Sequence, residues 1–257
     1  MPAFIQRITA KHHSLRNFRY YDILVHVFVV VLLISNLVGA KISAVGPFRV
    51  SGAQLLFPIT YIFGDIFTEV YGYSGSRRAI WIGFFASGLL ALMGLFVVWA
   101  PAAPNWHDQP AFETVFYQVP RMIIASLIAF WAGEFTNSYV LAKMKLLTRG
   151  RYLWMRTIGS TVAGQAVDTA IVITLAFAGR TDVTTILKLI GSGYLFKVVY
   201  EALATPITYM VVNALKRAEG VDVYDTETNF NPFVGEQVQP PPAVPSRDNT
   251  PVEVTRE

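Results

Sequence analysis

The sequence lacks cysteine, and only 15% of its 257 residues carry a charged side chain. Without cysteine the chain has no disulfide, no thiolate nucleophile and no thiolate metal site. Soluble domains carry about 25% charged residues, whereas 53% of this chain is hydrophobic. A single water-facing domain of this composition would be insoluble, so the composition excludes a soluble enzyme.

The chain also lacks the short motifs of hydrolases and of ATP-driven pumps. It contains no HExxH, GxSxG or GxxxxGKS/T sequence, which would mark a zinc site, a nucleophilic serine or a phosphate loop. Its four histidines, at positions 12, 13, 26 and 107, lie outside the polar residues discussed below. We therefore expect no enzymatic or ATPase activity, no metal site and no cofactor.

Apolar runs of about twenty residues are what the sequence has in abundance. A helix of that length crosses a hydrocarbon layer about 30 Å thick. We predict an all-α polytopic membrane protein embedded in the lipid bilayer, with six transmembrane helices over Tyr20–Ala40, Val50–Tyr71, Ile80–Trp99, Val119–Ala142, Ile158–Ala178 and Gly191–Leu215.

The ends of the chain differ in composition from this transmembrane domain, which covers residues 20–219. Residues 1–19 are expected to form a basic cytoplasmic arm. Residues 220–236 are expected to form a membrane-proximal segment, in which three aromatic residues of Asp222–Phe233 pack under the helices. Residues 237–257 contain Pro-Pro-Pro and scattered acids, which is typical of a disordered tail.

Lysine and arginine are distributed unevenly between the two sides of the predicted helices. Thirteen lie in the N-terminal arm, in alternate loops and just after the last span, against four in the remaining loops. Cytoplasmic loops carry the excess of such residues, so both termini are predicted to be cytoplasmic. The net charge of +4 is thereby explained by topology, and we expect no nucleic-acid partner.

Several ionisable and amide side chains lie within the predicted spans. An ionisable group near the bilayer centre costs at least about 2.5–3.5 kcal/mol, so it is kept where it is paired, faces a wet cavity or has a function. The residues concerned are Asn36, Asp65, Glu69, Glu134, Asn137, Gln165, Asp168, Lys197 and Glu201.

The spacing of these residues places each group on one helix face, because residues three or four apart lie on the same side of a helix. Each stripe is expected to face a shared interior near mid-membrane. We predict a substrate site formed by Asn36, Tyr61, Asp65, Glu134, Asn137, Gln165, Asp168, Lys197 and Glu201, with Asp65, Glu69 and Glu201 as candidates for proton coupling.

Structural alternatives exist for two of these groups. Lys197 and Glu201 are four residues apart and could form an ion pair within one helix. Glu69 lies near the predicted cytoplasmic end of its span, where it could pair with Arg77 or Arg78.

The chemistry of the predicted layer favours a flat ligand that is rich in N–H donors. Carboxylates accept hydrogen bonds, and amide side chains both donate and accept them. A purine-like base would suit such a site, with aromatic rings stacking on its face. Chemistry alone leaves a proton or a metal cation as an alternative ligand.

Five runs carry a resemblance to a known family: ISNLVGAKI (Ile34–Ile42), FPITYIFGDIFTEVYGYSGSRRAIW (Phe57–Trp81), GSTVAGQAVDT (Gly159–Thr169), FKVVYEALATPITY (Phe196–Tyr209) and TNFNPF (Thr228–Phe233). They resemble the queuosine precursor transporter family, also called the vitamin uptake transporter family. The resemblance covers nearly all of Tyr20–Phe233, in order.

The resemblance implies a six-helix bacterial inner-membrane protein that imports 7-cyano-7-deazaguanine or its 7-aminomethyl relative. The family is also similar to the substrate-binding subunits of energy-coupling-factor importers. The alternative is therefore a binding subunit for another vitamin or purine-like compound, which would need a separate energising module. The oligomeric state, including a homo-oligomer, stays open.

Overall fold

The computed structural model describes residues 6–9, 18–39, 41–45, 48–116, 120–179 and 182–234. The predicted tail over residues 237–257 and most of the predicted basic arm lie outside these ranges. Within them the chain forms six helices and four short strands. The helices are α1 (Tyr21–Val38), α2 (Gly52–Trp99), α3 (Gln109–Phe116), α4 (Pro120–Leu147), α5 (Leu153–Phe177) and α6 (Val183–Glu219).

The long helices have the length and composition of membrane spans. Four regions qualify by both criteria: α1, the Ile59–Trp99 part of α2, α5 and α6. The helix α2 is two helices joined at Gly72, where the backbone leaves the helical region (φ 77°, ψ 174°). The chain is therefore an all-α polytopic membrane protein, as the apolar runs predict.

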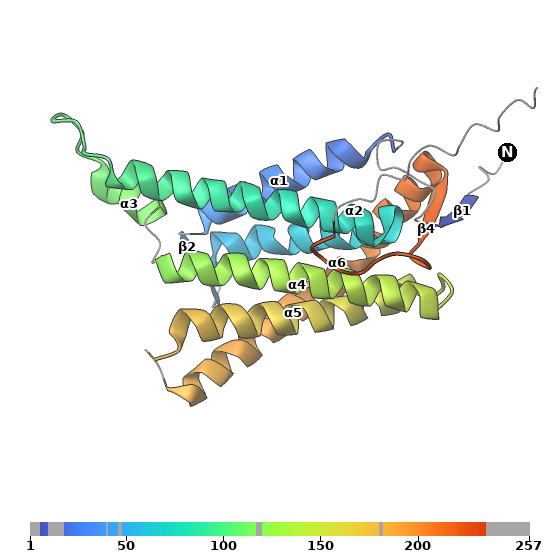
Figure 1. Cartoon of the computed structure of the whole chain (residues 1–257). Coiled ribbons are helices and arrows are strands. Elements are labelled where there is room, and N and C mark those ends of the chain that lie inside the picture. The colour runs from blue at the N-terminus through green and yellow to red at the C-terminus, as the bar shows by residue number, and fades with distance from the viewer. Residues whose placement is uncertain are drawn as a thin grey trace, which may run out of the picture.

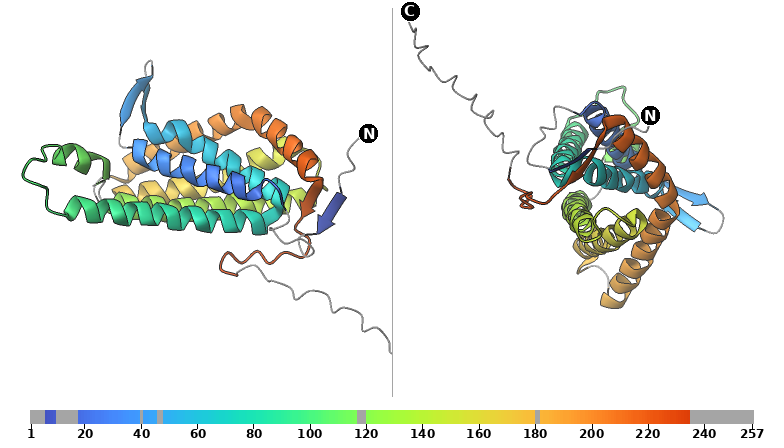
Figure 2. Two further views of the ribbon diagram at one scale, coloured as in Figure 1. Left: turned by 90° about the horizontal axis from the view of Figure 1, so that it is seen from above. Right: turned by 90° about the vertical axis from the view of Figure 1, so that its right-hand side faces the viewer.

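The long helices lie side by side, and the chain passes from one end of the bundle to the other in α1, in each half of α2, and in α4, α5 and α6 (Figure 1, Figure 2). At one end, β1 (Gln6–Thr9) pairs in parallel with β4 (Val221–Tyr224). At the other end lie α3 and the antiparallel hairpin of β2 (Ile42–Val45) and β3 (Phe48–Ser51). The first and last described elements thus meet at the same end of the bundle.

The turn between the two halves of α2 is shorter than the sequence predicts. We expected a loop after Tyr71 and a new span from Ile80, but residues 73–79 are helical and only Gly72 is not. The error arose because this stretch is polar. Its polar groups are used in tertiary contacts: the Ser76 and Ser138 hydroxyls lie 2.6 Å apart, and Arg77 donates to backbone carbonyls of the C-terminal segment. The last helix is also longer than predicted, because it begins at Val183 and not at Gly191.

The C-terminal segment, residues 221–234, packs against the second half of α2. Both carboxylate oxygens of Asp225 accept from the backbone N–H of Tyr73, at 3.1 and 3.0 Å. Further along, the Tyr73 hydroxyl donates to the Phe230 carbonyl and the Trp81 indole N–H donates to the Pro232 carbonyl. The helix that starts after Gly72 is therefore capped by a carboxylate from the far end of the chain, where a negative charge is favourable.

Candidate functional site

The structure brings eight of the nine predicted binding residues together between four helices. We call this set the buried polar cluster: Tyr61 and Asp65 on α2, Glu134 and Asn137 on α4, Gln165 and Asp168 on α5, and Lys197 and Glu201 on α6. Each of these side chains except Lys197 is at most 3% exposed. The carboxylate of Glu134 lies close enough to Asp65, Asp168 and Glu201 for their charges to interact.

Three contacts join the helices within the buried polar cluster. The Asn137 amide donates to Asp65 Oδ1 at 3.0 Å, joining α4 to α2. The Lys197 ammonium forms an ion pair with Asp168, joining α6 to α5. The hydroxyl of Tyr61 lies beside the Gln165 side chain, joining α2 to α5. Lys197, for which the sequence suggested a partner in its own helix, thus holds two helices together.

Hydrogen-bond acceptors exceed donors in this cluster. Among the described residues, no partner is found for Asp65 Oδ2, for either carboxylate oxygen of Glu134 or for Asn137 Oδ1. A buried polar group without a partner costs about 1–3 kcal/mol, and a carboxylate costs more. Four such acceptor atoms on two neighbouring helices form an arrangement that a ligand with several N–H donors would satisfy.

Glycines allow α4 and α5 to approach each other closely beside the buried polar cluster. A Cβ atom on Gly164 would lie 2.8 Å from Asn137 Cβ and 2.9 Å from the Gly133 carbonyl oxygen. A Cβ on Gly133 would lie 2.7 Å from Asp168 Cβ. Small residues at membrane helix interfaces permit such backbone contact. The spacing of the polar side chains of α4 and α5 therefore depends on these two glycines.

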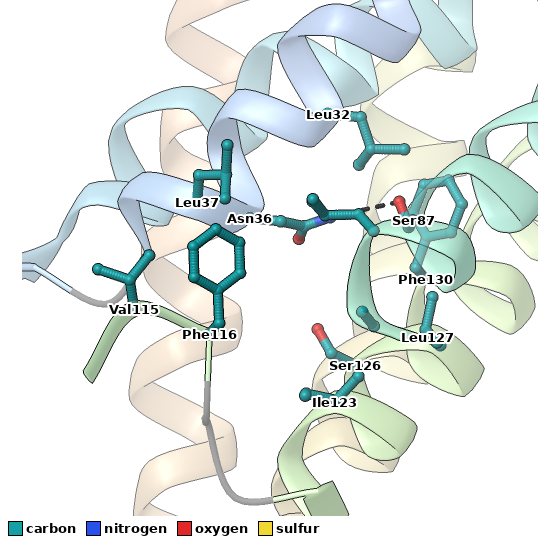
Figure 3. Close-up of a pocket in the computed structure, with 12 residues that line it drawn as sticks. Leu32, Asn36, Leu37, Ser87, Val115, Phe116, Ile123, Ser126, Leu127 and Phe130 are labelled. Carbon is teal, nitrogen blue, oxygen red and sulfur yellow. Dashed lines mark hydrogen bonds between the residues drawn. The ribbon is translucent and has the colours of Figure 1, made fainter. Parts of the chain in front are cut away.

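Asn36 is the predicted binding residue that the structure places elsewhere. It lines a pocket of about 100 Å³ between α1, α2, α3 and α4, and none of the other predicted residues lines that pocket. Its amide donates to the Ser87 hydroxyl at 3.2 Å (Figure 3). Figure 3 shows Phe116 of α3 and Phe130 of α4 on opposite sides of this amide. The prediction of a single layer is wrong for Asn36. Helix periodicity predicts which side of its helix a residue occupies, but it does not predict which other helices pack against that side.

Glu69 belongs to a separate group of charges, which we call the Glu69 ion cluster. Its Oε1 atom lies 2.6 Å from Lys216 Nζ, 2.7 Å from Arg156 Nη2 and 3.5 Å from Lys145 Nζ. Asp222 of β4 contacts both lysines, at 2.7 and 2.8 Å. Burial alone raises the pKa of the Asp222 carboxyl, but the two ammonium groups bring it below its usual range.

The partners of Glu69 differ from the predicted ones. Arg77 donates to the carbonyls of Asn229 and Asn231, and the Arg78 guanidinium lies over the ring of Tyr21. The contacts of the Glu69 carboxylate with three cations favour a structural role for this residue over the proton coupling predicted for it.

Two buried hydroxyl groups of α5 were missed at the level of the sequence. Thr161 and Thr169 are each 1% exposed and lie four residues before and after Gln165. The same four-residue spacing that selected the other stripes could have selected them.

Comparison with known proteins agrees with a polytopic membrane protein. Residues 51–211 match the family model described as "Putative vitamin uptake transporter". The chain is also similar to the "Probable queuosine precursor transporter" of Bacillus subtilis (strain 168), with 31% identity over 160 residues, which are 61% of this chain and 69% of that protein. No solved structure matches the chain. The matched residues include the whole buried polar cluster, and the chain belongs to the vitamin uptake transporter family of membrane proteins, which makes it a transporter and not an enzyme.

Proposed function

We propose that this protein imports a queuosine precursor, 7-cyano-7-deazaguanine or its 7-aminomethyl relative, through the buried polar cluster. The observation that carries the proposal is the excess of unpartnered acceptors on Asp65, Glu134 and Asn137. A 7-deazaguanine presents adjacent N–H groups on one edge, and a carboxylate can accept two of them at once. The similarity to a queuosine precursor transporter supports the same ligand class.

The combination of side chains in the site supports a flat ligand held between helices. Tyr61 contributes an aromatic ring on α2, beside carboxylates and amides from α2, α4 and α5. Pockets of this kind fix orientation with a few polar groups and bind the ligand face through apolar or aromatic contact. Because the cluster is buried on all described sides, substrate entry requires the helices to separate.

The proposed location is the bacterial inner membrane, with both termini in the cytoplasm. The pairing of β1 with β4 at one end of the bundle supports placing both termini on one side. That end also carries Lys145, Arg156 and Lys216, in agreement with the excess of basic residues near the cytoplasmic ends of membrane spans.

Binding is the first property to test. Titration of the purified protein with 7-cyano-7-deazaguanine should show saturable binding in the wild type. The variants Glu134→Gln and Asp168→Asn should bind at least tenfold more weakly, because hydrogen bonds to charged groups contribute about 1.5–3 kcal/mol. A matched control is Glu113→Gln, since Glu113 lies on the exposed helix α3. Equal affinity in both cluster variants and the wild type would show that the substrate binds elsewhere.

Transport distinguishes the importer from the alternative of a binding subunit for another vitamin or purine-like compound. Liposomes that contain only this chain should accumulate or equilibrate labelled 7-cyano-7-deazaguanine faster than empty liposomes. Binding without any flux would favour a subunit that needs a separate energising module. Repeating the flux measurement with an imposed proton gradient, in the wild type and in Asp65→Asn and Glu201→Gln, tests proton coupling through those two acids.

A further inference from the structure

Two buried threonines of α5 differ from several other helical threonines that the structure describes. The hydroxyls of these others donate to a carbonyl three or four residues earlier, as at Thr68, Thr114, Thr136, Thr157 and Thr205. The hydroxyls of Thr161 and Thr169 are buried, and no partner is found for either among the described residues. Their oxygen atoms are therefore turned away from the carbonyls that satisfy their counterparts.

The two hydroxyls lie on the helix face that carries the buried polar cluster. Thr161, Gln165 and Thr169 are spaced four residues apart, so they follow one another along the same side of α5. They cover about 12 Å of the helix. Thr169 presents its methyl group to α6, since its Cγ2 lies 3.6 Å from the position of a Cβ on Gly193. The stripe thus extends the cluster one turn in each direction.

Two donors of the buried polar cluster are already engaged by its own acceptors. The Asn137 amide donates to Asp65, and the Lys197 ammonium is paired with Asp168. A heteroaromatic ligand brings acceptors as well as donors: a carbonyl oxygen, ring nitrogens or a nitrile. Buried ligand acceptors need donors, because an unsatisfied one costs about 1–3 kcal/mol. The hydroxyls of Thr161 and Thr169 are two unpartnered donors on the described part of this face.

We propose that Thr161 and Thr169 are substrate-binding residues whose hydroxyls donate to acceptor atoms of the transported heteroaromatic compound. This inference rests on the proposed function and adds to it the recognition of the acceptor atoms of the ligand. The acids and amides then bind the N–H groups, and the two hydroxyls bind the acceptors. Leaving both hydroxyls unpartnered costs stability, and a ligand that accepts from them would offset that cost when it binds.

The variants Thr161→Val and Thr169→Val test the proposal, because valine keeps the shape and removes the hydroxyl. The probe is 7-cyano-7-deazaguanine, titrated against the full-length purified protein. Each variant should raise the Kd about tenfold, while its melting temperature without ligand stays equal to the wild type or rises. Replacing an unpartnered buried hydroxyl by a methyl group removes a desolvation cost, so stability should not fall.

Two further variants separate ligand binding from a structural role. Thr161→Ser and Thr169→Ser keep the hydroxyl and should bind with a Kd within about threefold of the wild type, since only a methyl group is lost. Thr157→Val is the matched control: Thr157 is equally buried on α5, but its hydroxyl donates to the Trp154 carbonyl. This variant should leave the Kd unchanged and lower the melting temperature slightly.

Each outcome has a distinct meaning. If the wild type binds the probe and the valine variants bind it with the same Kd, this inference is overturned and the proposed function stands. Valine variants that lose binding together with melting temperature, without recovery by serine, would show a structural role and would also overturn it. A wild-type protein that does not bind the probe would overturn the proposed function, and this inference with it.

Discussion

The close contact of α4 and α5 gives the sharpest test of how the interior is organised. In Gly164→Ala the new Cβ would lie 2.8 Å from Asn137 Cβ and 2.9 Å from the Gly133 carbonyl oxygen. Carbon atoms pack at about 3.5–4.0 Å, so the two helices must separate by at least about 0.7 Å. Overpacking of this kind costs about 1–3 kcal/mol, offset by about 1 kcal/mol from the higher helix propensity of alanine.

The expected loss of stability is therefore up to about 2 kcal/mol, or a few degrees in melting temperature. The effect on binding should be larger, because Asn137 and Asp168 sit on the two helices that are forced apart. Misplacement of binding groups by about 1 Å can weaken their joint action roughly a hundredfold. Ligand titration and a thermal melt of the same preparation measure both quantities.

Gly88→Ala provides the control for Gly164→Ala. It makes the same chemical change within α2, but nothing lies within 4 Å of the added Cβ. This variant should be as stable as the wild type or more stable and should bind equally. If the Gly164→Ala variant bound the ligand with the wild-type Kd, the spacing of α4 and α5 would not set the geometry of the site.

Other predictions concern charges. Lys197→Met should lower the melting temperature more than the double variant Lys197→Met with Asp168→Asn, because one orphaned buried charge is worse than none; equal melting temperatures would argue against the ion pair. Asp222→Asn should be less stable than the wild type at neutral pH. Because the folded-state pKa of Asp222 is lowered by the two lysines of the Glu69 ion cluster, its contribution is present above the unfolded pKa of about 4 and is lost as the pH falls through the lower, folded value. Melts from pH 7 to pH 3 should therefore converge for the two proteins, and a constant difference would contradict this. Asp225→Ala removes the cap of the second half of α2 and should cost about 0.5–2 kcal/mol, measured by denaturant unfolding in mild detergent, with exposed Glu227→Ala as a control.

Much of the site followed from the sequence because its signals are local. Asp65, Glu134 and Asp168 stand out against apolar runs, and three- and four-residue spacing places their neighbours on the same helix face. Those two facts lead to the prediction that polar residues from five spans meet in one interior. The structure brings the residues of four helices together, with Asn137 contacting Asp65 across helices, and places Asn36 of α1 elsewhere.

What could not be read from the sequence depends on contacts between distant segments. The partners of Glu69 come from α4, α5 and α6, between 76 and 147 residues away. The short break at Gly72 looked like a loop, because the polar residues after it are satisfied by the C-terminal segment, about 150 residues further along the chain. Asn36 shows the same limit, since its helix face is apparent but the neighbouring Ser87 is not.

The cap on the second half of α2 is synthesised long after the helix that it caps. The backbone N–H of Tyr73 receives its acceptor from Asp225, and Glu69 is linked to Asp222 through two shared lysines. The second and third passes are therefore synthesised long before the residues that complete their connecting turn. During synthesis this turn is therefore among the last parts of the chain to reach its final form. A nascent chain halted at residue 219 would contain every predicted span but would lack the carboxylates of Asp222 and Asp225, which contact this end of the bundle.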